Sequence, residues 1–223
     1  VLWAAVLLCV AVCTVGIDPP DFAHTSKSVL SAMGTGLLHP DWRFFFGTGK
    51  DGLGWLLLET VGIALAGTGL GALLAAPLAF LSTPKLLPRP VALLFRVLIV
   101  AIRSVPFLIY GLIFIRVSGP GAFTGVLTLA VCSIGLLSKR FTEAIEALDF
   151  RAYDALRAMG VSLLLRIRYA VLPQLAPALA SAVLYRFDVN IREASVLGLV
   201  GAGGIGAPLI FAMNQYAWSD VSA

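Results

Sequence analysis

The sequence predicts an all-α integral membrane protein with about five to six transmembrane helices. Hydrophobic residues make up 59% of its 223 residues and charged residues only 13%, whereas soluble domains carry about a quarter charged residues. Long stretches without charge alternate with short segments that hold most of the lysines and arginines. Because a membrane helix needs about 20 apolar residues and single strands cannot cross lipid, these stretches are predicted helices. The composition excludes an ordinary cytosolic protein and a disordered chain.

Six stretches are candidates for the membrane-spanning helices. They are residues 1–17, 60–84, 91–117, 118–138, 169–185 and 194–219. The stretch 60–84 is the clearest, since its 25 residues carry no charge. Three arginines interrupt 91–117, and a glycine cluster breaks 194–219. We therefore count five spans and a sixth, ambiguous segment.

The positions of lysine and arginine predict the orientation of these helices. Cytoplasmic loops of membrane proteins are enriched in both residues. Six of them lie between residues 139 and 168, and Lys85 and Arg89 lie in the connection 83–90. Both segments are therefore predicted to be cytoplasmic, with the N-terminus inside and the loop 18–54 outside. This divides the chain into a first helix with an extracytoplasmic loop (1–54) and a transmembrane domain (55–223).

A small-residue pattern in the stretch 60–84 predicts close helix packing. Gly67 and Gly71 are four residues apart and form a small-xxx-small pair, which lets another helix approach closely. Such pairs serve both packing within a chain and contacts between subunits. We favour packing within the chain.

Motifs for nucleotide or metal chemistry lack the surroundings that they require. Gly201, Gly203 and Gly206 satisfy G-x-G-x-x-G, but that fingerprint needs a preceding strand and an acidic residue about 20 positions later. The two histidines, His24 and His39, both lie in the predicted outer loop, and the three cysteines lie in apolar runs. The sequence therefore predicts no catalytic, cofactor-binding or metal site. We read the net charge of +4 as membrane topology and predict no nucleic-acid partner.

The predicted cytoplasmic segment contains a short helix with capping residues at both ends. Asp149 is a favourable N-cap and Gly160 a favourable C-terminal stop, which predicts a helix from Phe150 to Met159 that is about 15 Å long. Apolar residues recur at helical spacing, namely Ala152, Ala155, Leu156 and Met159. A short helix of this kind suits a partner's groove, and the alternative is a helix that lies on lipid headgroups.

Several motifs in the second half of the chain match a known pattern. Asp154-Ala155-Leu156 is followed after three residues by Gly160 and then by Leu172-Pro173. This resembles the EAA loop of ABC importer permeases, with Asp154 in place of the glutamate and Leu156 in place of the second alanine. The runs 101–106, 169–174, 184–192 and 196–206 are similar to the phosphonate-type permeases of that superfamily. The resemblance covers roughly residues 55–220.

The resemblance implies a type I ABC importer transmembrane fold with a cytoplasmic coupling helix at about 149–160. It implies a bacterial inner-membrane permease for phosphonate or a related phosphorus oxyanion, with a second copy of itself, a cytoplasmic ABC ATPase dimer and an extracytoplasmic substrate-binding protein as partners. ATP and Mg would be bound by the ATPase, so this chain would not itself be an enzyme. The residues assigned to ATPase coupling are Asp149, Tyr153, Asp154, Ala155, Leu156, Met159 and Gly160.

Arginines inside the predicted spans are candidates for a substrate pathway. Arg96 and Arg103 are seven residues apart and share a helix face, and Pro106 is expected to bend or break the helix beyond them. Arg186 and Arg192 follow the stretch 169–185 at its expected outer end. An intramembrane arginine usually faces a bundle interior or an aqueous cavity, and its planar fork matches the oxygens of phosphate-like anions.

We predict that a translocation pathway is lined by Arg103, Arg186, Asn190 and Arg192. The alternative for the two outer arginines is that they snorkel or pair with Asp188 and Glu193. A different class of function also stays open, namely a self-contained secondary transporter or channel for a small anion.

Overall fold

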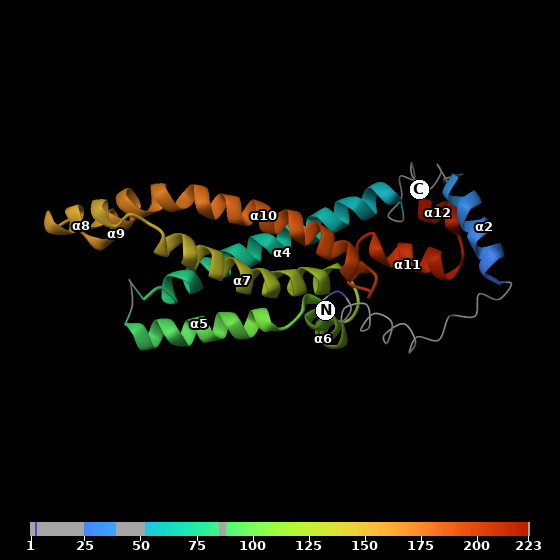
Figure 1. The fold of residues 1–223 in the computed structure, drawn as a ribbon, viewed down its shortest axis with the longest axis horizontal. Helices are drawn as coiled ribbons and strands as arrows, with labels where there is room; N and C mark the ends of the chain where they lie inside the picture. The colour runs from blue at the N-terminus through green and yellow to red at the C-terminus, as the bar shows by residue number, and fades with distance from the viewer. Residues whose placement is uncertain (1–2, 4–24, 39–51, 85–87, 223) are drawn as a thin grey trace.

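The computed structural model describes residues 3, 25–38, 52–84 and 88–222, which form helices and their connections (Figure 1). The described helices are α2 (Thr25–Leu38), α4 (Leu53–Leu81), α5 (Arg89–Ser104), α6 (Phe107–Ser118), α7 (Ala122–Glu146), α8 (Arg151–Ala158), α9 (Leu163–Arg166), α10 (Leu172–Gly198), α11 (Gly206–Asn214) and α12 (Trp218–Ser222). A π-helical turn, Ile167–Val171, joins α9 to α10. Apart from Trp3, the predicted first span (1–17) lies outside the described residues, as do both histidines.

Three long apolar helices form the centre of the fold. α4, α7 and the continuous segment Leu163–Gly198 are each long and apolar enough to cross a membrane. They run lengthwise beside one another (Figure 1). The prediction of an all-α membrane protein is confirmed. The described residues contain three such helices, or four if α5 and α6 together form one broken span.

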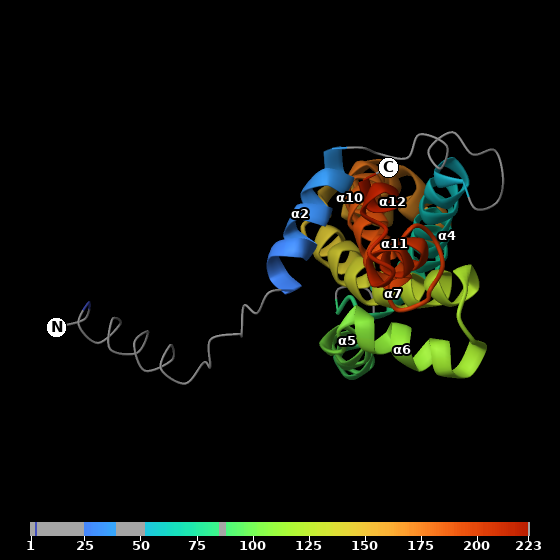
Figure 2. The ribbon, with the colours of Figure 1, turned by 90° about the vertical axis from the view of Figure 1, so that its right-hand side faces the viewer.

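The stretch 91–117 forms a bent pair of helices instead of a straight span. α5 ends at Ser104, α6 begins at Phe107, and the two axes differ by 84°. Pro106 lies between them as the N-cap of α6, because its ring cannot continue the preceding helix. α6 therefore lies across the view in Figure 2, which looks along the bundle. The predicted break at Pro106 is confirmed.

The last two predicted spans have different limits in the structure. The stretch 169–185 belongs to a segment of 36 residues, Leu163–Gly198, so the helix extends well beyond the predicted end at Tyr185. The stretch 194–219 is not a single helix. Gly201, Gly203 and Gly204 have positive φ angles of 97°, 83° and 72°, and a left-handed backbone ends a helix. The nine-residue α11 follows this turn.

α4 and α7 approach each other closely along the predicted glycine pair. A Cβ atom on Gly67 would lie 2.7 Å from Leu129 Cβ, and one on Gly71 would lie 2.4 Å from Ser133 Cβ. Both distances are shorter than a carbon–carbon contact, so only glycine allows this approach. The prediction that the pair packs within the chain is confirmed.

Two apolar clusters fill the core, one toward each end of the three long helices. The first cluster consists of Ile63, Ala64, Leu129, Ala194, Leu197 and Ala202. The second cluster consists of Ala75, Ala79, Leu137, Phe141, Ile145, Val171 and Leu175. Buried polar residues on the same helices, among them Thr68 and Ser133, lie between the two clusters in the sequence of each helix.

The described residues of the two predicted cytoplasmic segments lie at the same end of the molecule. α8 and α9 occupy the end to which α4 leads, and α2, α11 and α12 lie at the opposite end (Figure 1). We call the end with α8 the inner end and the opposite end the outer end.

Candidate functional site

The predicted coupling helix forms α8 and projects from the inner end of the bundle. None of its residues is buried. Asp154, Ala155 and Gly160 are exposed, and Met159 has 69% of its surface exposed. The helix thus exposes both an apolar methionine and an acidic carboxylate, which a partner can contact.

The C-terminus of α8 has the full hydrogen-bonding pattern of a glycine-capped helix. Gly160 has a φ angle of 73°. Its N–H donates to the carbonyl of Arg157, and the N–H of Val161 donates to the carbonyl of Leu156. This pair of bonds is the Schellman motif. The predicted stop at Gly160 is confirmed.

The N-terminus of α8 differs from the prediction by one residue. The helix begins at Arg151, with Phe150 as its N-cap, so Asp149 is not the N-cap. Its carboxylate still accepts a hydrogen bond of 3.0 Å from the backbone N–H of Arg151. The ring of Phe150 packs edge-to-face against that of Tyr153, which favours Phe150 at the start of the helix.

Tyr153 attaches α8 to the rest of the molecule. Its side chain packs against the second apolar cluster, which lies at the inner end and which we call the inner apolar cluster. The guanidinium carbon of Arg166 lies 5.1 Å from the Tyr153 ring centroid. Leu156, the other predicted residue on this side, is partly buried. Gln174 adds a hydrogen bond of 3.3 Å to the carbonyl of Asp149. Of the predicted coupling residues, Tyr153 thus faces inward, whereas Asp154, Ala155 and Met159 are presented outward.

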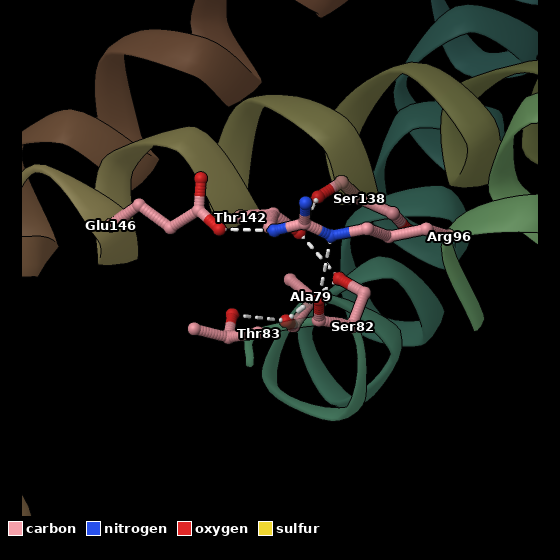
Figure 3. Close-up of polar contacts among 7 residues, drawn as sticks. All are labelled: Ala79, Ser82, Thr83, Arg96, Ser138, Thr142 and Glu146. Carbon is pink, nitrogen blue, oxygen red and sulfur yellow. Dashed lines mark hydrogen bonds and ion pairs between the residues drawn. The ribbon is translucent and has the colours of Figure 1, made fainter. Parts of the chain in front are cut away.

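A cluster of polar contacts joins α4, α5 and α7 at the inner end (Figure 3). Arg96 donates to the carbonyl of Ser82 at 3.0 Å and forms an ion pair with Glu146. The hydroxyls of Ser82 and Thr142 lie 2.6 Å apart and share a hydrogen bond. Thr142 in turn donates to the carbonyl of Ser138 at 2.7 Å. Arg96 therefore holds α5 against the ends of two other helices.

A second polar cluster lies midway along the long helices. The Arg186 side chain is buried, donates from Nε to Ser133 Oγ at 3.0 Å and forms an ion pair of 2.8 Å with Glu193. Asn190 is also buried, and its Nδ2 lies 2.7 Å from Thr68 Oγ1 and 2.9 Å from Ser133 Oγ. These side chains join α4, α7 and α10, which places them inside the bundle.

The expectation that Arg186 and Asn190 lie at the outer end of their span is wrong. Their partners, Thr68 and Ser133, are near the middle of α4 and α7. The helix extends twelve residues beyond Arg186 to Gly198, because buried partners satisfy its polar side chains and it need not end where they begin.

The other two predicted pathway residues are more exposed. Arg192 pairs with Asp188 one helical turn away on the open face of α10. Arg103 is exposed in the last turn of α5, and it lines cavities on both sides. The structure thus brings Arg186 and Asn190 together and places Arg103 across a small cavity from Arg186. Arg192 lies on a different face.

Sequence reasoning missed several residues that position this region. Ser133 accepts a hydrogen bond from Arg186, and Thr68 accepts one from Asn190. Gly135 leaves room for the Arg103 side chain, since a Cβ at residue 135 would lie 2.8 Å from Arg103 Cγ. Single polar or small residues within an apolar stretch carry little local signal. Among the described residues, no group of three or more histidine, cysteine or acidic side chains is arranged to hold a metal ion.

Comparison with known proteins agrees with the helical arrangement. Residues 67–222 match the model of the family described as binding-protein-dependent transport system inner membrane component. The fold is similar to that of the MetNI methionine ABC transporter in inward-facing conformations, with a TM-score of 0.65, 20% identity and coverage of 74% of this chain and 85% of the other.

Two curated relatives show clear sequence similarity. The phosphite transport system permease protein PtxC of Stutzerimonas stutzeri is 39% identical over 168 residues, which cover 75% of this chain and 61% of the relative. The phosphate-import permease protein PhnE of Mycolicibacterium smegmatis is 42% identical over 158 residues, which cover 70% of this chain and 30% of the relative. The chain thus spans less than two thirds of either relative. It belongs to the family of binding-protein-dependent transport system inner membrane components.

Proposed function

We propose that this chain is the permease subunit of an ATP-driven importer for a phosphorus oxyanion such as phosphonate, phosphite or phosphate. The names of the two relatives point to this class of substrate. The arginines midway along the bundle, Arg103 and Arg186, fit it, because guanidinium groups bind phosphate-like oxygens in a bidentate manner.

The observation that carries the proposal is the exposed and firmly capped helix α8. It lies at the inner end, has no buried residue and is fixed to the bundle through Tyr153. A helix that only connected two spans would not need to expose both Met159 and the carboxylate of Asp154. We infer that Asp149, Tyr153, Asp154, Ala155, Leu156, Met159 and Gly160 form the coupling site for a cytoplasmic ABC ATPase dimer.

A second copy of the chain is the neighbour of α10 in this proposal. α10 exposes Ser181, Tyr185, Asp188 and Arg192 along one face. An exposed ion pair such as Arg192–Asp188 is costly against lipid and favours a polar neighbour. Arg140, whose guanidinium lies 6.0 Å from the Tyr185 ring, extends this polar surface onto α7. We assign this face, with Arg192, to the contact with the second copy. We place the anion path along α5, where Arg103 lies beside the buried Arg186 and Asn190.

The remaining parts of the complex follow from the family. An extracytoplasmic binding protein would deliver the anion at the outer end, and the ATPase would bind ATP and Mg, so this chain contributes no catalysis. We place the protein in the bacterial inner membrane as a multi-pass subunit in lipid, with its N-terminus in the cytoplasm.

The test compares two glycines that have positive φ angles. Gly160 has a φ of 73°, Gly119 has a φ of 82° with a ψ of 169°, and a Cβ on either would meet nothing within 4 Å. Valine is strained at both positions, by about 1–2 kcal/mol at Gly160 and by about 1–3 kcal/mol at Gly119, but only Gly160 borders α8. Gly160→Val should weaken ATPase retention in detergent pull-down and reduce ATP turnover stimulated by the binding protein, whereas Gly119→Val should behave like wild type in both assays.

A second variant tests the exposed charge of α8. Asp154→Lys should weaken retention if the carboxylate meets a basic wall of the ATPase groove. Full retention and stimulation in both Gly160→Val and Asp154→Lys would make α8 a connector only. The result would then favour a self-contained transporter or channel.

A further inference from the structure

Two cavities lie along α5, and Arg103 lines both. The outer cavity, of about 190 Å³, has Arg103, Arg186 and Glu193 as its charged lining residues. The inner cavity, of about 250 Å³, has Arg96, Arg103, Lys139, Glu143 and Glu146 as its charged lining residues. Each cavity therefore has one more basic side chain than acidic ones.

The unbalanced positive charge belongs to Arg103 in both cavities. Arg186 pairs with Glu193 at 2.8 Å, Lys139 pairs with Glu143 at 3.5 Å, and Arg96 pairs with Glu146. Within the part of the chain that the structure describes, Arg103 has no ion-pair partner. The guanidinium of Arg103 is thus the unpaired positive charge in both cavities.

The position of Arg103 lets its guanidinium group reach either cavity. It is the last residue but one of α5, directly before the bend at Pro106. Its stem crosses α7 at Gly135, where a Cβ would lie 2.8 Å from Arg103 Cγ and 3.0 Å from Ile102 Cγ2. The absence of a side chain at this crossing gives the arginine stem room to lie between the two cavities.

The depth and size of these cavities suit a small anion. Gly135 is near the middle of α7, so the stem of Arg103 lies about midway along that helix, and an unpaired guanidinium among packed membrane helices needs water or an anion. A single water requires roughly 10–15 Å³ of such volume. Both cavities exceed that by more than about tenfold and can hold a tetrahedral anion with some of its water.

We propose that Arg103 binds the transported phosphorus oxyanion first in the outer cavity and then in the inner cavity. The inference rests on the proposed function and adds the two holding sites. In each cavity, the planar fork of Arg103 donates to two anion oxygens. The ion-paired glutamates repel any further anion, so each cavity holds one at a time. Transfer inward needs only a swing of the arginine head, since its stem stays at Gly135.

A native cysteine reports on the outer cavity. Cys132 lines the outer cavity and is partly exposed. The double variant Cys9→Ala/Cys13→Ala keeps Cys132 as its single thiol. Val100 lines the inner cavity, and Val100→Cys in a background without native cysteines reports there. The rate of N-ethylmaleimide modification is measured in the full transporter in proteoliposomes, with inorganic phosphate, phosphite or methylphosphonate, and with chloride as the reference.

Because one Arg103 holds the anion in only one cavity at a time, we expect the transported oxyanion to slow modification of both reporters, by about twofold each when the anion is saturating and divides equally between the two cavities. Arg103→Gln should abolish protection at both sites, and Arg103→Lys should retain part of it, since lysine keeps the charge without the fork. Arg116→Gln is the matched control, because Arg116 is an exposed arginine of α6 that lines neither cavity.

The outcomes separate this inference from the proposed function. Protection that survives at either reporter in Arg103→Gln overturns the shared role of Arg103. A wild-type transporter that imports phosphite with ATP but shows no protection overturns the two holding sites and leaves the importer intact. A wild-type chain without ATP-dependent uptake counts against the proposed function itself.

Discussion

The closeness of α4 and α7 leads to a sharp prediction for Gly71→Ala. The added Cβ would lie 2.4 Å from Ser133 Cβ and 3.2 Å from the carbonyl oxygen of Ala130. Carbon atoms prefer a separation of about 3.5–4.0 Å, so the two helices must part locally by about 1 Å. Gly69 supplies the matched control, since it is exposed on the same helix and a Cβ there would meet nothing within 4 Å.

The expected cost combines overpacking with lost hydrogen bonds. Overpacking costs about 1–3 kcal/mol, whereas the gain of about 0.5–1 kcal/mol in helix propensity is common to both variants and cancels in their difference. A shift of Ser133 by about 1 Å would also carry its contact with Asn190, now 2.9 Å, beyond the range of a hydrogen bond. We expect Gly71→Ala to be less stable than Gly69→Ala by about 2 kcal/mol, or about 30-fold in the unfolding equilibrium.

The assay is unfolding of the purified protein in detergent, followed by circular dichroism across a denaturant series. Wild type, Gly69→Ala and Gly71→Ala are compared in the same micelles. Gly69→Ala should match or exceed wild type. Equal midpoints for the two variants would refute the close crossing of α4 and α7 at Gly71 and, with it, the placement of Ser133 beside Arg186.

The remaining predictions concern the inner end and the topology. Arg96→Gln and Glu146→Gln should each destabilise the protein in the same detergent assay, with a coupling of about 1 kcal/mol in the double-mutant cycle; additive effects would mean that the two side chains do not interact. Single cysteines at Thr48 and Ser162, in a background without native cysteines, should react with an impermeant thiol reagent from opposite sides. Labelling of Ser162→Cys but not Thr48→Cys in intact cells would reverse the predicted orientation.

Features with a local physical cause could be predicted from the sequence. The bend at Pro106 follows from a missing N–H and a fixed φ, and the end of α8 follows from the preference of Gly160 for a left-handed backbone. The glycine pair in α4 predicted close packing because small residues are what such packing requires. Each of these predictions depends on a few neighbouring residues.

Helix lengths could not be predicted because they depend on distant partners. Lys139 and Arg140 look like the start of a loop, but α7 continues to Glu146. The charges in its last turns are paired, since Glu143 meets Lys139 and Glu146 meets Arg96. In the same way, α10 continues past Arg186 because Glu193 and Ser133 meet its guanidinium.

The surroundings of Cys132 could not be predicted either, because they depend on a distant segment of the chain. An apolar surrounding predicts a small core residue, and Cys132 does lie within a long apolar helix. The bend between α5 and α6 opens a cavity beside it, however, so that it lines the same space as Arg103 and Glu193. The chain segment that creates the cavity is about 25 residues away, and no local pattern reports it.

The arrangement of the core decides where an anion can pass. Between α4, α7 and α10, Asn190 donates hydrogen bonds to Thr68 and Ser133, and an apolar cluster closes the bundle on either side of these three residues. A path must therefore run beside this core, along α5, where the two cavities lie.

The inner apolar cluster links that path to α8. Tyr153 packs against the cluster, which also contains Ile145 at the end of α7, and the neighbouring Glu146 lines the inner cavity. A displacement of α8 by an ATPase would reach the inner cavity first, through Tyr153 and the end of α7. The outer cavity lies beyond the buried Arg186–Glu193 pair, which costs about 3–5 kcal/mol to break. We therefore expect ATPase movement to change access to the inner cavity while the ion pair keeps the outer cavity in place.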